Sequence, residues 1–370
     1  MTRAVVIGAG IIGVCCALRL ARAGAQTILV DTDQIEDAPR RAASLAAAGM
    51  LAPWSEALFH PPPTDAVMDF AVQGLQRWEQ EARHFPDGMQ LSHGALIIAE
   101  DQVHEDWLAA KLASGALENI APQWLSADEA RERAGCDLKI RSALLIAEEA
   151  SVNPRVAYDL ILRETLNAGC ARVQGEAVGF GTVNGRLSSV ICVDGTSLAA
   201  DIAVVAPGAA ASQSLRAVLP ALAHVRPAKG QRIAMSGALG AGPTLRNQDV
   251  YIARGAADET IVGATMIDGA DDFEIDHAAT RALAESAASF CPALSQTAVS
   301  SVSVGLRAMS EDGAPLIGPH GPEGVFLATG HGRNGWLMAH VTADLIADYV
   351  FAHPVKNRAV FDPARFENVK

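Results

Sequence analysis

A glycine-rich turn near the start of the chain constrains its fold more than any other feature. The motif GAGIIG at residues 8–13 follows an apolar stretch that predicts a fully buried strand. It opens a predicted helix over 11–23, and a second predicted strand over 26–31 ends in an acid, Asp31. Glycines at this spacing allow a tight turn, a close approach of the backbone to a pyrophosphate, and close packing of helix on strand. The segment predicts a dinucleotide-binding unit.

The chemistry of this unit indicates how it would hold its ligand. The N-terminus of the helix offers unpaired N–H groups and a positive dipole end to phosphates. Asp31 would accept hydrogen bonds from ribose hydroxyls, and its carboxylate disfavours a 2′-phosphate. A glycine-rich turn in another kind of α/β protein is the alternative. The strand, helix, strand and acid, all at the required spacing, favour the dinucleotide interpretation.

Composition excludes several classes of function. The 370 residues, half of them apolar, suffice for one large domain or two modest ones. A net charge of −13 disfavours a nucleic-acid surface, which needs a basic stripe. No apolar run approaches the ~20 residues of a membrane span, and the first apolar run belongs to the glycine-motif strand rather than to a signal peptide.

The cysteines predict a reduced environment and no metal site. They are scattered, with no CxxC pair and no cluster of His and Cys. This pattern favours a cytoplasmic, metal-free protein. The six positions are Cys15, Cys16, Cys136, Cys170, Cys192 and Cys291.

A second strand–glycine–helix pattern near the end of the chain predicts a discontinuous nucleotide fold. A strand over 325–329 leads into a glycine-rich turn over 330–335 and then into a long apolar helix. Such a unit so far from the first one suggests that another domain is inserted in the middle of the nucleotide fold. The intervening sequence predicts helices over 65–85, 155–168 and 277–290, and strands over 93–100 and 299–307.

Together, the motifs of this chain resemble a known family, the D-amino-acid-oxidase superfamily of FAD enzymes. The resemblance is strongest to glycine oxidases of the thiamine-biosynthesis type, and some features are similar to D-amino-acid dehydrogenases. The motifs that carry it, in chain order, are the opening glycine turn, AAAGMLAP at 46–53, VNP at 152–154, VVAPGA at 204–209, VYI at 250–252, IVGATM at 261–266, GLRAMSEDGAPLIG at 305–318 and GHGRNGW at 330–336.

The resemblance implies a mixed α/β fold. A discontinuous Rossmann-like FAD-binding domain would carry an inserted substrate domain built on an antiparallel sheet. The implied FAD-binding segments are 1–85, 150–220 and 300–370, and the implied substrate-binding segments are 86–149 and 221–299.

The resemblance also implies a set of residues for FAD. Sarcosine oxidases have a flavin-linking Cys near the position of Gly305, where this chain has none, so we expect noncovalent FAD. The implied residues are Gly8, Gly10, Ile11, Ile12 and Gly13 along the pyrophosphate, Asp31 and Thr32 at the ribose, Ala43, Ser44, Ala48, Gly49 and Met50 at the flavin, the Val178 backbone at the adenine, Gly208, and Gly330, His331, Gly332, Arg333, Asn334, Gly335 and Trp336 at the isoalloxazine edge.

By the same resemblance, Tyr251, Arg307 and Arg333 would hold the substrate. Arg307 follows a predicted strand and can bind a carboxylate through two parallel hydrogen bonds, which Lys cannot do. Without the resemblance, the two arginines could be surface charges and Tyr251 a core aromatic. His331 better suits backbone contact with the flavin than a role as general base.

The implied reaction is oxidative deamination of glycine or a small D-amino acid. Hydride would pass from Cα to flavin N5, giving a 2-oxo acid and ammonia, with O₂ as acceptor and H₂O₂ as product. The alternative is a D-amino-acid dehydrogenase with a quinone-type acceptor, its substrate being a D-hydroxyproline, for example, because Trp54 and Trp336 would sit near the ligand. An NAD-dependent reductase and a noncatalytic FAD-binding scaffold also remain open, as does assembly into a homo-oligomer.

Overall fold

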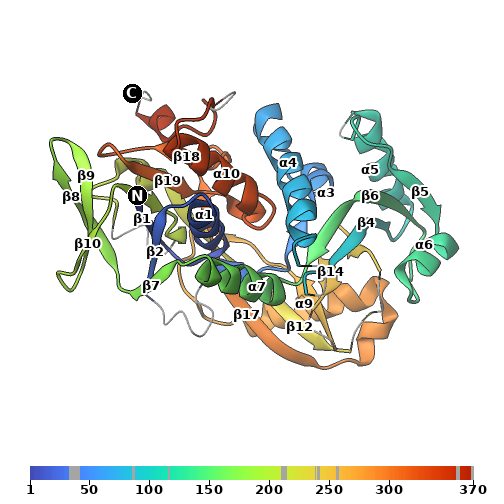
Figure 1. The fold of residues 1–370 in the computed structure, drawn as a ribbon. Coiled ribbons are helices and arrows are strands. Elements are labelled where there is room, and N and C mark those ends of the chain that lie inside the picture. Colours follow the sequence, from blue (N-terminus) through green and yellow to red (C-terminus); the bar gives the residue numbers. More distant parts are fainter. Residues whose placement is uncertain are drawn as a thin grey trace.

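The computed structural model describes residues 1–32, 42–85, 88–115, 117–209, 215–237, 239, 242–255, 258–355 and 359–367. Within these residues the strands form a six-stranded, a three-stranded and a ten-stranded sheet. The first two lie at one side of the molecule and the third extends to the other side (Figure 1).

The six-stranded sheet holds the glycine motif. Its order is β18-β19-β11-β1-β2-β7, and all neighbours are parallel except β18 and β19. The strands are β1 (Arg3–Ile7), β2 (Gln26–Asp31), β7 (Ala171–Gln174), β11 (Ile202–Val205), β18 (Leu316–Pro319) and β19 (Val325–Thr329).

Both faces of this sheet are buried, which explains its continuous apolar strands. Successive side chains of a strand point to opposite faces. Val6 of β1 joins the apolar cluster formed with α1 (Ile11–Arg22) and α10 (Ala339–Val350), and α7 (Pro154–Asn167) packs against α1. Val5 joins a separate cluster on the other face. Figure 1 shows α1 and α10 side by side beside the sheet.

The three-stranded antiparallel sheet closes the second face. Leu187 and Val190 of its middle strand belong to the same apolar cluster as Val5 of β1. The strands are β8 (Ala177–Val183), β9 (Arg186–Cys192) and β10 (Ser197–Ala199).

The ten-stranded sheet is antiparallel except where β13 runs parallel to β4. Its path is β16-β12-β15-β14-β13-β4-β6-β3, with β17 paired to β12 and β5 paired to β6. The strands are β3 (Met50–Leu51), β4 (Leu91–Ala99), β5 (Gln123–Ser126), β6 (Ser142–Val152), β12 (Val225–Ser236), β13 (Thr244–Arg246), β14 (Tyr251–Arg254), β15 (Glu259–Gly263), β16 (Ile267–Asp268) and β17 (Val299–Ser310).

Apart from α2 and η3, the remaining helices start at polar caps or prolines. Thr64 caps α4 through the Val67 N–H, and Asp276 caps α9 through two backbone N–H groups. These helices are α2 (Ala43–Ala46), α3 (Pro53–Phe59), α4 (Asp65–Ala82), α5 (Gln102–Ala113), α6 (Ala127–Ala134) and α9 (His277–Phe290), with short 3₁₀ turns η1 (Pro220–His224), η2 (Pro292–Gln296), η3 (Gly332–Asn334) and η4 (Pro363–Phe366).

The chain crosses repeatedly between the sheets, which confirms the predicted discontinuous fold. It leaves the six-stranded sheet after β2, builds β3 to β6, and returns with β7. It leaves again after β11, builds β12 to β17, and closes the first sheet with β18 and β19. The predicted domain boundaries stay a prediction. Two strands of the ten-stranded sheet cross these boundaries: β6 spans the one at 149/150, and β17 spans the one at 299/300.

The predicted helices over 65–85, 155–168 and 277–290 correspond to α4, α7 and α9. The apolar helix after the second glycine turn begins only at Ala339, because the preceding residues form η3 and a further turn. The carbonyl of Trp336 in this turn accepts a hydrogen bond from Trp78 Nε1 of α4 at 2.6 Å. The turn is therefore anchored to a neighbouring helix.

Candidate active site

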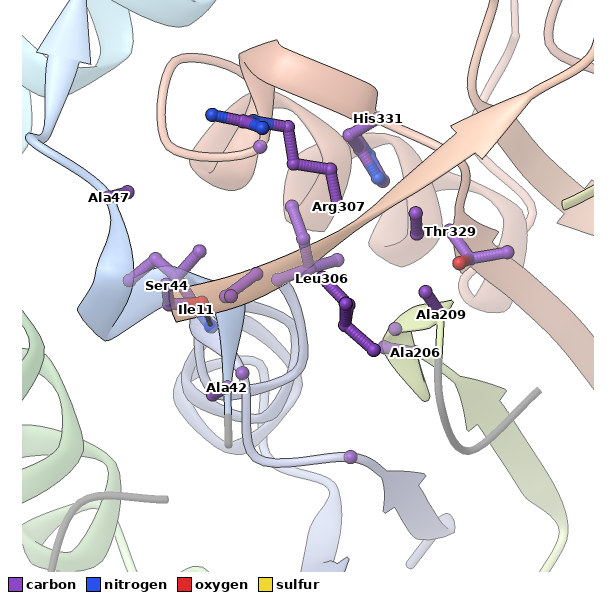
Figure 2. A pocket seen from close by; sticks show the side chains of 18 of the residues that line it. Ile11, Ala42, Ser44, Ala47, Ala206, Ala209, Leu306, Arg307, Thr329 and His331 are labelled. Carbon is purple, nitrogen blue, oxygen red and sulfur yellow. Dashed lines mark hydrogen bonds between the residues drawn. The ribbon is translucent and has the colours of Figure 1, made fainter. Parts of the chain in front are cut away.

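A cavity of about 570 Å³ is lined by residues of both large sheets. Figure 2 shows Ile11, Ser44, Arg307 and His331 around it, contributed by segments far apart in the sequence. The lining segments are the turn after β1, the end of β2, residues 42–44 and 46–50 with Ala52 and Glu56, 175–177, 206–209, Leu215, Gly230, Arg246, Tyr251, 305–308 and 328–336.

The turn after β1 takes the tight form that the glycine motif predicts. A Cβ atom at Gly13 would overlap the carbonyl oxygen of Gly8, so helix and strand could not pack as they do. Asp31 Oδ2 accepts the N–H of Ala9 at 2.5 Å, and Ser44 Oγ accepts that of Ile11 at 2.9 Å. The motif is therefore held in shape from β2 and from α2.

The start of α1 suits a phosphate group. Its N-cap, Gly10, provides no side-chain hydrogen bond, and the first turn contains no acidic residue. A Cβ at Gly10 would meet nothing closer than Ser44 Oγ at 3.5 Å, so the cavity reaches the backbone there. The Ile11 N–H is taken by Ser44 Oγ, so the next N–H of the first turn, that of Ile12, and the positive end of the helix dipole are what α1 offers to the cavity.

Most of the predicted cofactor residues lie around this one cavity. Gly13 and Val178 do not line it: Gly13 packs behind the turn, and the cavity reaches 175–177 rather than Val178. The predicted residues that line it are Gly8, Gly10, Ile11, Ile12, Asp31, Thr32, Ala43, Ser44, Ala48, Gly49, Met50, Gly208, Gly330, His331, Gly332, Arg333, Asn334, Gly335 and Trp336.

The other end of the cavity contains the predicted substrate residues. Arg307 of β17 is largely buried, and its Nη1 donates to the Thr265 carbonyl at 3.2 Å. The guanidinium lies over Gly230 of β12, where a Cβ would collide with it. Tyr251 lies in the same way over Gly263 of β15. Two strand glycines thereby make room for two polar side chains on the cavity-facing surface of the sheet.

Arg246 and Glu56, two charged residues that the sequence analysis did not predict, complete this end of the cavity. Arg246 is the cross-strand partner of Tyr251, and its Nη2 lies 3.0 Å from Glu56 Oε2. Arg333 Nε lies 2.5 Å from Glu56 Oε1. Arg246 also lies over the ring of Phe59, at 4.3 Å from its centroid. Glu56 thus joins α3 to β13 and to the glycine-rich turn η3.

The charges at this end shift one another's pKa values. Burial lowers the pKa of Arg307 and raises that of Tyr251, where the nearby guanidinium groups oppose the rise. Burial alone would raise the pKa of Glu56, but Arg246 and Arg333 outweigh it and hold that pKa below its usual value. Glu56 is therefore ionised at neutral pH.

His331 is a poor candidate for a general base. Burial lowers its pKa to about 3, and its Nε2 lies 2.9 Å from Thr342 Oγ1. The ring is neutral at physiological pH and its Nε2 already has a partner. Lys229 of β12 is no better a candidate. It forms an ion pair with Asp272 and does not line the cavity.

The two tryptophans differ in position. Trp336 lines the cavity, is buried, and donates from Nε1 to the Ser44 carbonyl at 2.8 Å. Trp54 is buried but does not line the cavity, so the expectation that it sits near the ligand is wrong. Glu56, two residues further along α3, lines it instead.

Two kinds of feature are missing from the described residues. In those ranges no group of His, Cys, Asp and Glu side chains is placed to hold a metal ion. No helix among them has both the length and the apolar character to cross a membrane. All six cysteines lie within the described part and are free thiols, and none of them lines the cavity.

The fold and the cavity combine a glycine turn of the dinucleotide-binding type with an end lined by three arginines. Comparison with known proteins identifies the family of the chain. The model of the FAD dependent oxidoreductase family (DAO) matches residues 3–349, and the chain belongs to this family. The predicted superfamily, the enzyme class and FAD as cofactor are thereby confirmed, and the NAD-dependent reductase alternative is set aside.

Individual relatives support this assignment. The chain is 29% identical over 381 residues to glycine oxidase from Pseudomonas putida, covering 97% of each protein. The crystal structure of glycine oxidase from Geobacillus kaustophilus matches with a TM-score of 0.85 at 24% identity, covering 99% of each chain. A short segment is 54% identical over 46 residues to D-amino acid dehydrogenase from Sinorhizobium medicae, covering 12% of this chain and 11% of that protein.

Proposed function

We propose that this protein oxidatively deaminates glycine or a small D-amino acid to the 2-oxo acid and ammonia. One observation carries the proposal: Arg307 and Tyr251 line the same cavity as the dinucleotide-binding turn, close enough for the Arg307 charge to act on the phenol. The glycine oxidases that this chain resembles point the same way. When bound, FAD would supply the oxidising chemistry, as the acceptor of hydride from the substrate Cα at N5, and O₂ would be the final electron acceptor.

In this proposal the substrate carboxylate binds Arg307. A guanidinium binds a carboxylate through two parallel hydrogen bonds, and burial makes such a charged pair stronger than it is in water. The phenol of Tyr251 donates a further hydrogen bond. With its carboxylate fixed, the substrate is oriented in the cavity, and such orientation is the main contribution that a protein makes to a cofactor-based oxidation.

The chain also favours the reactive form of the substrate amine without a dedicated base. Hydride leaves readily only from a substrate whose amine is neutral. Three guanidinium groups, those of Arg246, Arg307 and Arg333, line this end of the cavity, and positive charge nearby lowers the pKa of an amine. The substrate can then lose its proton to solvent before oxidation.

For the cofactor we propose the arrangement that the cavity suggests. The pyrophosphate would lie at the start of α1, facing Ile11 and Ile12, with the ribose near Asp31 and Thr32. Ala43, Ser44 and residues 48–50 would contact the flavin, together with the 330–336 turn. Noncovalent binding is supported by the absence of cysteine among the described residues that line the cavity.

A D-amino-acid dehydrogenase with a quinone-type acceptor is the second candidate. It is supported by the 46-residue match to the Sinorhizobium medicae protein and by the large side chain of Trp336 in the cavity. A D-hydroxyproline would be an example of its substrate. The acceptor, assembly into a homo-oligomer and the cytoplasmic location stay predictions, and the choice between thiamine synthesis and amino-acid catabolism stays open.

Anaerobic bleaching of the flavin absorbance tests the proposal. Glycine, sarcosine, D-alanine, D-proline and D-hydroxyproline would be added in turn to the purified holoenzyme. Bleaching by glycine or D-alanine followed by rapid recovery in air supports the oxidase. Bleaching with slow recovery in air supports the dehydrogenase. Failure of these amino acids and of acidic D-amino acids alike to bleach the flavin would contradict both and favour a noncatalytic FAD-binding protein.

A further inference from the structure

The substrate end of the cavity has more positive than negative charge. Arg246, Arg307 and Arg333 line it, and among the described residues Glu56 is the carboxylate that accompanies them. The other acidic side chains in the lining, Asp31 and Glu176, lie at the dinucleotide end, where Asp31 accepts the Ala9 N–H. Buried charges are normally paired, so this excess calls for an anion.

A further acidic residue behind α3 does not remove the excess. Glu149 of β6 does not line the cavity, and its Oε1 accepts the N–H of Ser55 at 2.6 Å. Burial raises its pKa to about 7, so it is largely protonated below neutral pH. It makes no ion pair with Arg246 within the described residues, and its electrostatic effect on the cavity is weaker than that of Glu56.

The same end of the cavity is rich in hydrogen-bond donors and poor in acceptors. Each guanidinium carries several N–H donors and no acceptor. In the described part of the chain, Arg307 donates only to Thr265 O, and Arg246 only to Glu56. Arg333 donates to the thioether of Met266, a weak acceptor, and its buried Nε–H has no aligned partner despite its short distance to Glu56.

An ordinary amino acid would not correct this shortage. Its single carboxylate would be used by Arg307 and Tyr251, and its amine would add further donors. Donors left unpaired in a buried site cost free energy, so the remaining guanidinium groups favour a second acceptor-rich group.

The sheet places the cationic groups on opposite sides of Tyr251. Across β14, Tyr251 pairs with Arg246 on β13 at one side and with Gly263 on β15 at the other. Beyond β15 comes β12, over whose Gly230 the Arg307 guanidinium lies. Arg333 enters from η3 and joins Arg246 through Glu56. The cavity therefore offers two separate positions for an anion, one on each side of the phenol.

We propose that the preferred substrate is a D-amino acid with an acidic side chain, such as D-aspartate or D-glutamate. Its α-carboxylate binds Arg307 and Tyr251, and its side-chain carboxylate binds Arg246 and Arg333 at the N–H groups that Glu56 leaves unused. This inference rests on the proposed amino-acid oxidation and narrows its substrate class.

Pairs of acids and isosteric amides test the inference in the wild-type holoenzyme. Anaerobic flavin reduction would be followed with D-aspartate against D-asparagine and with D-glutamate against D-glutamine. We expect kcat/KM for the acid to exceed that for the amide by at least about tenfold, because the amide cannot neutralise the second cation. Glycine and D-alanine serve as small neutral references.

Two variants should move this acid-to-amide ratio in opposite directions. Arg246→Met keeps an apolar stem over Phe59 but removes the charge, so the ratio should fall toward one. Glu56→Gln removes the competing carboxylate, so the ratio should rise. Arg365→Met is the matched control: this arginine is mostly buried and paired with Asp312, but it does not line the cavity, and the ratio should stay as in the wild type.

The outcomes separate the two proposals. Neutral amino acids that reduce the flavin as well as the acidic ones overturn this inference and leave the proposed function standing. If no amino acid reduces the flavin, the proposed function fails and the inference fails with it. Should Arg246→Met lose its flavin or fail to fold, the wild-type pairs and Glu56→Gln still decide the matter.

Discussion

The two ends of the cavity are built on different principles. The dinucleotide end is mainly backbone: a glycine turn, the start of α1, and small side chains of residues 42–49. The substrate end is mainly side-chain charge, brought together from β13, β17, α3 and η3. At the first end the glycine turn, Asp31 and residues 42–49 all lie within one early stretch of the chain, whereas the second end is made by contacts between segments far apart in the sequence. The first therefore depends on the absence of side-chain atoms, and the second on particular charged groups.

The largest effect is expected from adding a single methyl group to a glycine at the dinucleotide end. Gly13→Ala adds one methyl group that would overlap the Gly8 carbonyl oxygen, so α1 must move away from β1. We expect purified protein with little or no FAD, measured by the ratio of flavin to protein absorbance. Gly179→Ala in β8 is the control, because a Cβ there meets nothing within 4 Å. Full flavin content in Gly13→Ala would contradict the role of close packing.

At the substrate end the opposite pattern is expected, with cofactor retained and substrate lost. Arg307→Ala should keep FAD but lower kcat/KM, because substrate binding weakens by about 2–5 kcal/mol. That is the range seen when one partner of a buried charged pair is removed. Steady-state kinetics on the best substrate measures this. Arg226→Ala is the control. It removes an exposed ion pair between Arg226 of the neighbouring β12 and Asp268 of β16, and kcat/KM should change little. An unchanged KM in Arg307→Ala would disprove the carboxylate role.

Glu149, the buried acid of β6 that binds the start of α3, should make the stability of the protein depend on pH. Burial raises the pKa of Glu149 from 4.5 to about 7. Between these values the native state holds a proton that the unfolded chain has released, so stability falls as pH rises. Above about pH 7 the loss reaches about 3 kcal/mol, which Glu149→Gln would abolish.

Urea unfolding of both proteins at acidic and at mildly alkaline pH measures this difference. The variant should gain on the wild type as pH rises. Parallel pH profiles for the two proteins would show that Glu149 is ionised in the native state throughout this range.

A helix cap remote from both ends sets the lower limit of expected effects. Ser126 caps α6 in a reciprocal arrangement with Glu129. Ser126→Ala should cost about 1 kcal/mol of stability and leave flavin content and kcat/KM as they are. Thermal unfolding gives the first quantity. A change in kcat/KM would mean that the substrate end of the cavity depends on residues outside its own lining.

The sequence predicted the dinucleotide end better than the substrate end, for a physical reason. The motif from β1 to Asp31 is local, so spacing alone determines strand, turn and helix. Glu56 and Arg246 were missed because α3 and β13 are too short to show a periodic pattern, and their pairing depends on tertiary contact. Trp54 was misplaced for a related reason: residues two apart in a helix of about 3.6 residues per turn point in nearly opposite directions, so Glu56 faces the cavity and Trp54 does not.

The order in which the six-stranded sheet is completed affects when cofactor can be captured. In that sheet β1 pairs with β11, and β11 pairs with β19, whose residues Val325–Thr329 come late in the chain. During synthesis the glycine turn emerges long before β19 and α10, so its supporting sheet stays incomplete until those elements have left the ribosome. Flavin uptake is therefore a late event in the biogenesis of this enzyme, and nascent chains that stall before β19 are expected to be flavin-free.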